Sequence, residues 1–130
     1  MNRKTLLSTL WIFAVLNYLY CDVLSLMDHN FLSKLLDGNI DGLVMNEGFL
    51  LGASVLMEVS ISMVLLSRIL PYKSNRVANL IAGTITTLVQ IGSLFIGEVT
   101  MHYMFFSTIE IGTTAFIFWK ALKWEETKAE

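Results

Sequence analysis

The chain has 130 residues, of which 55% are hydrophobic and only 15% are charged, with a formal net charge of -2. Its mean hydropathy is +0.62. A soluble domain of this length could not bury so much apolar surface, so these values favour a membrane protein. The single cysteine, Cys21, excludes an internal disulfide and a Cys-x-x-Cys redox pair within one chain.

Four apolar runs of about twenty residues each have the length that a helix needs to cross a hydrocarbon core of about 30 Å. The runs lack the alternation of polar and apolar residues that is typical of membrane β-strands. We therefore predict an all-α fold, an antiparallel four-helix transmembrane bundle forming a single domain over residues 1–130. The predicted spans are residues 6–26, 49–70, 77–96 and 103–122.

The connections between the predicted spans are short except for the first. Pro71, the only proline, ends the second span, and Ser74 or Asn75 can cap the third. Residues 97–102 leave room only for a turn before the fourth span. Within the first connection, apolar residues between 31 and 36 recur at helical spacing. This spacing predicts a short amphipathic helix that lies on the outward-facing surface of the membrane.

Lysine and arginine are distributed unequally between the two sides of the predicted bundle. Lys34 is the only one on one side, and eight lie on the other: Arg3, Lys4, Arg68, Lys73, Arg76, Lys120, Lys123 and Lys128. Because basic residues are retained in the cytoplasm, both termini are predicted to be cytoplasmic, in a multi-pass protein of the inner (plasma) membrane. Trp11, Trp119 and Trp124 lie near span ends, where we expect interfacial anchors.

Each predicted span carries a polar residue that hydrocarbon would reject: Asn17 and Asp22, Glu58, Gln90, and Glu110. At 1.5 Å per residue these side chains lie about 6 to 13 Å below the outer span ends, in one band. Tyr18 lies one helical turn from Asp22. Ionisable residues within spans usually face the bundle interior. The pattern therefore predicts an outward polar cavity centred on Glu58 and Glu110.

Two interpretations of this band stay open. In the first, two neighbouring carboxyl groups in a low-dielectric space cannot both stay ionised without a cation, so the cavity binds a proton or a small cation. The chain would then be a small transporter or ligand-binding protein. In the second, protonated Glu58 and Glu110 only hydrogen-bond to Asn17 and Gln90, holding helices together at about 0.6 kcal/mol per bond. Asp22, near the interface, is simply hydrated in that interpretation.

Small residues mark two helix faces that favour close packing. Gly48 and Gly52 form a Gly-x-x-x-Gly face, and Gly83 with Thr87 forms a similar surface. These faces suit a homodimer, or a non-catalytic component that associates with another membrane protein. An enzyme is the weakest alternative, because no electrophile, metal or cofactor motif accompanies the carboxylates. Beyond the lipid bilayer, a small cation or proton is the expected ligand, and no cofactor, metal or nucleic acid is expected.

Several segments carry a family resemblance: Leu10 to Phe13, Asn17 to Tyr20, Gly48 to Ala53, Leu56 to Glu58, Leu65 to Arg68, Asn75-Arg76, Asn79 and Ala82-Gly83. With them the chain resembles a family of small bacterial four-helix integral membrane proteins whose function is uncharacterised. The resemblance covers nearly the whole chain, and Glu58 lies in its most distinctive stretch. It implies the four-helix fold and supplies no activity.

Overall fold

The computed structural model describes residues 2–40, 42–96 and 99–125 of the chain. In this part, the chain forms five α-helices and one short hairpin: α1 (Arg3–Ser25), α2 (His29–Leu36), β1 (Asn39–Ile40), β2 (Leu43–Val44), α3 (Glu47–Ile69), α4 (Tyr72–Ser93) and α5 (Met101–Leu122). The predicted all-α class is confirmed, and the predicted short helix in the first connection is present as α2.

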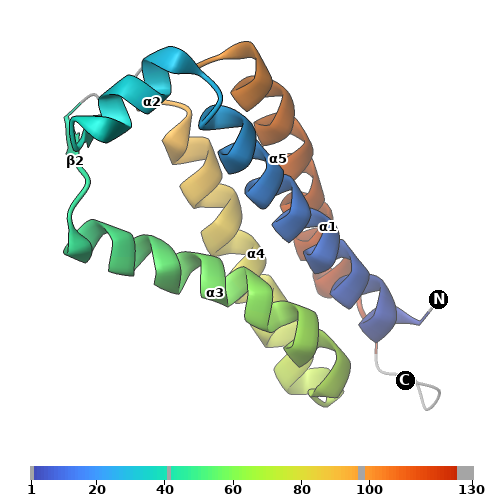
Figure 1. The fold of residues 1–130 in the computed structure, drawn as a ribbon. Coiled ribbons are helices and arrows are strands. Elements are labelled where there is room, and N and C mark those ends of the chain that lie inside the picture. Colours follow the sequence, from blue (N-terminus) through green and yellow to red (C-terminus); the bar gives the residue numbers. More distant parts are fainter. Residues whose placement is uncertain (1, 41, 97–98, 126–130) are drawn as a thin grey trace.

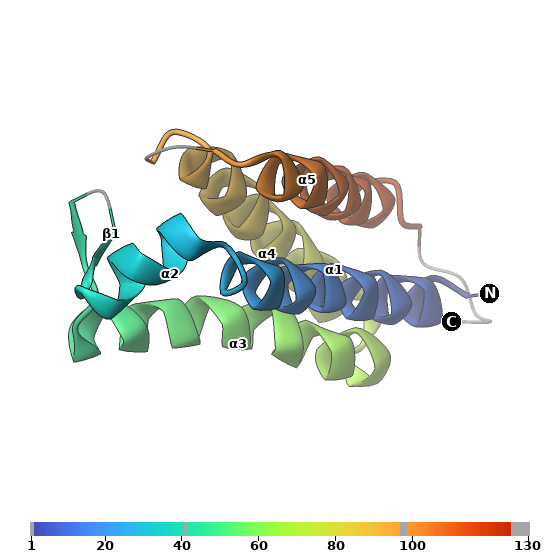
Figure 2. The same ribbon diagram turned by 45° about the horizontal axis from the view of Figure 1, so that its top comes forward.

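The four long helices form a ring in which each packs against two others (Figure 1). α1 packs on α3 and α5, and α4 packs on the same two helices. One end of the ring carries the start of α1, the turn between α3 and α4, and the end of α5. We call this the basic end, since seven of the eight predicted cytoplasmic basic residues lie there; Lys128 lies outside the described residues. α2 and the hairpin lie at the opposite, hairpin end (Figure 2).

The turn between α3 and α4 is built differently from the prediction. Pro71 directly precedes α4 and has no side chain that could cap it, while Ser74 and Asn75 lie inside the helix. Asn75 is buried, and its Nδ2 donates hydrogen bonds to the carbonyl oxygens of Ser67 (2.7 Å) and Leu70 (3.2 Å). The asparagine therefore satisfies carbonyl groups at the end of α3, which would otherwise have no partner within their helix.

A β-hairpin that the sequence analysis did not predict follows α2. Asn39 and Ile40 pair with Val44 and Leu43 in antiparallel register. Gly38, at the start of the hairpin, has a φ of 77°, which favours glycine. Gly97 and Glu98, in the last predicted turn, lie outside the described residues.

The core lies toward the basic end, and it corrects the prediction for two tryptophans. Trp11 is 0% exposed and Trp124 is 3% exposed, and both belong to a cluster with Leu7, Met63 and other apolar side chains. They are core residues, because the helices converge where these large rings can fill the interior. Trp119 is 49% exposed, as an interfacial anchor would be.

Buried polar groups at the basic end are paired across helices. The indole Nε1 of Trp11 donates to Oδ1 of Asn79 at 2.8 Å. Nδ2 of Asn79 donates to Oδ1 of Asn75 at 2.7 Å, and the Ser67 hydroxyl donates to Oδ1 of Asn79 at 3.4 Å. These bonds join α1, α3 and α4, so the network fixes the relative positions of three helices.

The N-terminal half of α3 leaves the bundle. Ser60, Met63 and Ser67 are its buried residues, and none of residues 47–59 is buried. Figure 1 shows α3 diverging from α4 toward the hairpin end. The helix is therefore anchored by its second half only.

Two of the long helices, α1 and α3, are long and apolar enough to cross a membrane by length and composition alone. Only 11% of the most apolar stretch of α3 is buried within the chain. Most of its apolar surface is therefore not covered by the other helices of the chain. α4 and α5 do not meet this criterion, and α4 carries Asn75, Asn79 and Gln90 among its polar residues. The four-span arrangement thus stays a prediction.

Candidate functional site

A cavity of about 500 Å³ opens at the hairpin end. Its walls come from α1, α2, the hairpin, the start of α3, the end of α4 and the start of α5. Most of its lining is apolar, and a few polar side chains converge on it, including Asp22, Asp28, Lys34, His102 and Tyr103. An apolar pocket with a small number of converging polar groups is the usual form of a ligand site.

Hydrogen bonds hold the cavity wall together across three helices. The two ring nitrogens of His102 lie 3.1 Å from the hydroxyl oxygens of Ser25 and Thr100. The hydroxyls of Tyr103 and Ser93 are 2.5 Å apart. These contacts fix the start of α5 against the ends of α1 and α4, so the polar side chains of the wall have defined positions.

Glu110 lies deeper in the bundle, below this cavity. It follows Tyr103 by two turns of α5, which is about 10 Å along the helix axis. The side chain is only 1% exposed. Tyr18, Cys21 and Asp22 of α1 are close enough to interact with it electrostatically. Asp22 also lines the cavity, so one of the groups that interact with the buried carboxyl group can be reached from the cavity.

Two buried polar atoms at this position lack a hydrogen-bond partner by distance and angle, although Thr86 of α4 lies near the Tyr18 hydroxyl. Among the described residues, the side-chain oxygen and nitrogen atoms that are fully buried and unpaired are Tyr18 Oη and Glu110 Oε1. Buried polar groups are almost always paired, and one left unpaired costs about 1–3 kcal/mol. The two exceptions are neighbours, on facing helices, beneath the cavity. Because the two unpaired atoms lie close together, we take Tyr18 and Glu110 as the candidate site.

The arrangement suits a proton or a single cation. A carboxyl oxygen accepts hydrogen bonds and binds cations, and a phenol can donate or accept. No lysine, arginine or histidine within residues 2–40, 42–96 and 99–125 forms an ion pair with Glu110. Nor does any group of three or more His, Cys, Asp or Glu side chains in those ranges gather as a metal site would require. A carboxyl group in this position can take up a proton or bind a cation.

The other predicted site residues have different positions. Gln90 contributes to the same region, because its Nε2 donates to the buried Ser107 hydroxyl at 2.8 Å, one turn before Glu110. Asn17 does not, since its Nδ2 donates to the carbonyl oxygen of Phe13 in its own helix at 2.8 Å. Gln90 thus links α4 to α5, while Asn17 makes no bond to another helix.

Glu58 requires a correction. It was expected to share a cavity with Glu110, but it lies on an exposed face of α3. Its carboxyl Oε1 accepts a hydrogen bond from the Ser62 hydroxyl, one turn away on the same helix, at 3.4 Å. The reason is the divergence of α3: a helix that leaves the bundle cannot bring the side chains of its first half into the interior. The site is centred on Glu110 and Tyr18.

One contributor escaped the sequence analysis. Cys21 had no predicted role in the site, yet it is 2% exposed and close enough to Glu110 to interact with it electrostatically. Its spacing of three residues from Tyr18 places the two side chains on one face of α1, and this spacing was a usable signal.

Comparison with known proteins places the chain in a family. A family of unknown function, DUF6326, matches residues 1–130. The chain belongs to this family. The predicted membership of an uncharacterised family is confirmed, and membership of DUF6326 assigns no activity. No curated protein and no solved structure gives a match.

Proposed function

We propose that this DUF6326 protein is a multi-pass protein of the inner membrane that binds a proton or a small cation at Glu110, and that it acts as a small transporter or ligand-binding protein. In this proposal all four long helices span the bilayer and the basic end faces the cytoplasm. The cavity at the hairpin end opens to the outside.

The membrane arrangement is supported by charge and apolar surface. The basic residues gather at one end of the ring, as expected for the cytoplasmic side. Large apolar side chains are exposed along every long helix; Leu51, Leu65, Leu88 and Phe105 are each at least 60% exposed. Lipid would cover these side chains without cost. Most polar residues in the middle of α4 and α5 face inward, among them Asn79, Thr86, Ser107, Glu110 and Thr114, as polar residues of membrane helices do.

The carrying observation is the pair of unpaired buried atoms, Tyr18 Oη and Glu110 Oε1, beneath an open cavity. A ligand that enters the cavity meets Asp22 at its wall, and Asp22 is close enough to Glu110 to interact with it electrostatically. Negative charge on these two acids favours cations over anions. A cation or proton at Glu110 would supply the partner that the chain itself does not.

A thermal-stability screen of the detergent-purified protein tests the proposal. A ligand that binds only the folded state stabilises it by about 2.7 kcal/mol at a hundred times its dissociation constant. We expect tetraphenylphosphonium, sodium or potassium to raise the melting temperature of the wild type. Glu110→Gln keeps the size and polarity of the side chain but cannot carry charge, so it should abolish the rise.

Glu58→Gln is the matched control, because it makes the same chemical change at the exposed acid. It should leave the ligand-induced rise intact. If Glu110→Gln responds like the wild type, or if Glu58→Gln alone abolishes the response, the proposed site is wrong. If none of the three cations stabilises the wild type, the cation-binding proposal fails.

A second candidate function has its own observation. Among residues 47–59 of α3 none is buried, and this stretch carries the Gly48–Gly52 face and the start of a polar stripe at Ser54 and Glu58. An ionisable residue that faces lipid is rare. We infer that a non-catalytic component, covering this half of α3 with another membrane protein or a second copy, is the alternative. Glu58→Gln and Gly52→Val would weaken such an association and leave cation binding unchanged.

A further inference from the structure

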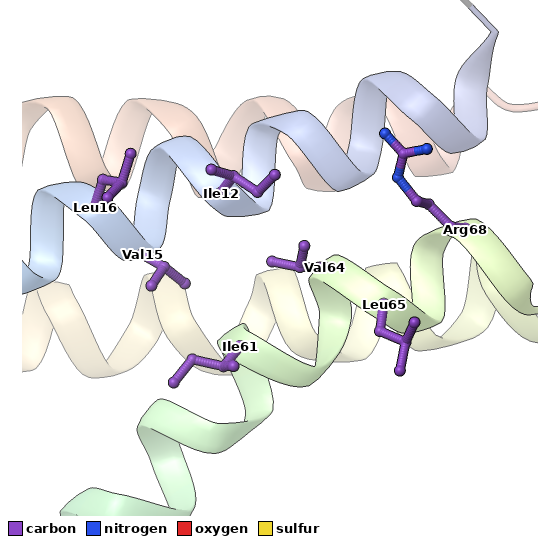
Figure 3. Close-up of a pocket in the computed structure, with 7 residues that line it drawn as sticks. All are labelled: Ile12, Val15, Leu16, Ile61, Val64, Leu65 and Arg68. Carbon is purple, nitrogen blue, oxygen red and sulfur yellow. The ribbon is translucent and has the colours of Figure 1, made fainter.

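A second hollow lies between α1 and α3, and none of its lining residues belongs to the candidate site. Figure 3 shows side chains of the two helices facing each other across it, with Arg68 at the end nearest the start of α1. The hollow has a volume of about 350 Å³. Apart from Arg68 its lining is apolar: Ile12, Val15, Leu16, Ile61, Val64 and Leu65. We call it the α1–α3 groove.

Arg68 is held in place at the end of this groove. Its Nε donates to the Ser8 hydroxyl at 3.2 Å. Ser8 is 0% exposed and donates in turn to the carbonyl oxygen of Val64 at 2.7 Å. Arg68 itself is exposed. The guanidinium group therefore has a fixed orientation set by a buried residue of the neighbouring helix.

Most of the hydrogen-bonding capacity of Arg68 remains for a ligand. A guanidinium group has five N–H donors, and in the described part of the chain only Nε has a protein acceptor. No carboxylate of that part forms an ion pair with it. The two terminal amino groups form the fork that matches a phosphate group. Arg76 differs, because its Nε and Nη2 donate to carbonyl oxygens at the end of α5.

The groove and the arginine together have the pattern of an anionic phospholipid. Ile61 precedes Arg68 by seven residues, so the apolar groove extends about 10 Å along α3 from the guanidinium group. An acyl chain lying in the groove would place the lipid phosphate at its mouth, next to Arg68. Lys4, in the first turn of α1, adds to the attraction for a negatively charged head group.

We propose that the α1–α3 groove binds one anionic phospholipid, with an acyl chain between α1 and α3 and its phosphate on the terminal amino groups of Arg68. The inference rests on the membrane arrangement proposed above and not on cation binding at Glu110. The occupied groove lies where α3 begins to diverge, so the lipid bridges the two helices at that point.

Native mass spectrometry of the detergent-solubilised full chain tests this site. Phosphatidylglycerol and phosphatidylcholine with identical acyl chains are added separately, and the fraction of protein carrying one lipid is measured. The wild type should retain phosphatidylglycerol roughly tenfold more tightly, as expected for a charge-assisted hydrogen-bonded pair. Arg68→Gln should remove this preference. Lys73→Gln removes one positive charge at the same end of the bundle without touching the groove, and should keep the preference.

A second variant tests the acyl-chain part of the site. Val15→Phe places a ring in the groove, so retention of both lipids should fall while Arg68 is unchanged. Excess inorganic phosphate should not displace the lipid, because phosphate has no acyl chain to fill the groove. The lipid site is wrong if Arg68→Gln keeps the preference, if Lys73→Gln loses as much of it, if Val15→Phe has no effect, or if phosphate competes.

The outcome separates this inference from the proposed function. A chain that stays in solution without detergent contradicts the membrane arrangement, and with it the lipid site. A chain that needs detergent but shows no lipid preference contradicts the lipid site alone. Glu110→Gln should bind phosphatidylglycerol like the wild type, so loss of cation binding and loss of lipid binding can be told apart.

Discussion

The buried polar groups at the two ends of the bundle differ in whether they have hydrogen-bond partners. At the basic end, Trp11, Asn75 and Asn79 are buried and each is hydrogen-bonded to a neighbouring helix or turn. Toward the hairpin end, Tyr18 Oη and Glu110 Oε1 are buried and unpaired. The first end also holds the hydrophobic cluster, whereas the second holds the larger cavity.

This difference distinguishes buried polar groups that hold the fold together from buried polar groups that can bind a ligand. A fully paired network fixes helix positions and leaves nothing for a ligand to satisfy. An unpaired carboxyl group lowers stability unless something outside the chain completes it. The Trp11–Asn79–Asn75 network at the basic end therefore acts as the rigid clamp of the fold, and the hairpin end as the region proposed to bind the cation. Substitutions at the two ends should consequently affect different measurements.

Asn79→Ala should have the largest effect on stability. It removes the acceptor for Trp11 Nε1 and for Ser67, and it leaves buried donors that cost about 1–3 kcal/mol each when unpaired. Unfolding of the purified protein by dodecyl sulfate titration should therefore begin at a clearly lower detergent fraction. Asn17→Ala is the control, since Asn17 bonds only to its own helix and should change the titration little. Equal effects of the two substitutions would show that the network does not clamp the helices.

Gly83→Val should have an intermediate effect. A Cβ at Gly83 would lie 3.4 Å from the backbone oxygen of Thr114 and 3.5 Å from Cβ of Phe118, so the added methyl groups would push α4 from α5. Overpacking of this kind costs about 1–3 kcal/mol. Gly52→Val is the matched control, because a Cβ there meets nothing within 4 Å. A Gly83→Val protein that melts like Gly52→Val would contradict the close α4–α5 contact.

Tyr18→Phe should have the smallest effect on stability and a visible one on binding. Removing a buried, unpaired hydroxyl should leave the free energy of unfolding unchanged or raise it by up to about 1 kcal/mol. The cation-induced rise in melting temperature should shrink, because one of the two atoms of the site is lost. Tyr20→Phe is the control at a tyrosine that is 57% exposed. A strong loss of stability in Tyr18→Phe would mean that the hydroxyl is already paired.

The sequence predicted the helices well because each is an apolar run of sufficient length. Predicted and observed starts and ends differ by a few residues, and α4 begins at Tyr72, five residues before its predicted start. The shift arises because residues 72–76 are polar and were assigned to a turn. Asn75 and Arg76 are accommodated by hydrogen bonds to the end of α3 and the end of α5, a tertiary effect that hydropathy does not report.

The site was predicted only in part, for a related reason. Position along a helix follows from residue counting, and the structure brings Gln90 and Asp22 to the region of Glu110. Which side chains face inward depends on how each helix packs, and α3 packs through its second half only. Glu58 was therefore misplaced, although its depth and chemistry resemble those of Glu110. The pairing of Trp11 with Asn79 was missed because the two residues lie 68 positions apart.

The most direct test of the central claim is chemical labelling of the buried carboxyl group. Dicyclohexylcarbodiimide, a hydrophobic reagent, reacts with protonated carboxyl groups, and peptide mass spectrometry locates the adduct. We predict an adduct at Glu110 that forms more slowly when tetraphenylphosphonium is present, while labelling of Glu58 is unaffected by the cation. Absence of an adduct at Glu110, or equal protection of both acids, would contradict a cation site at this carboxyl group.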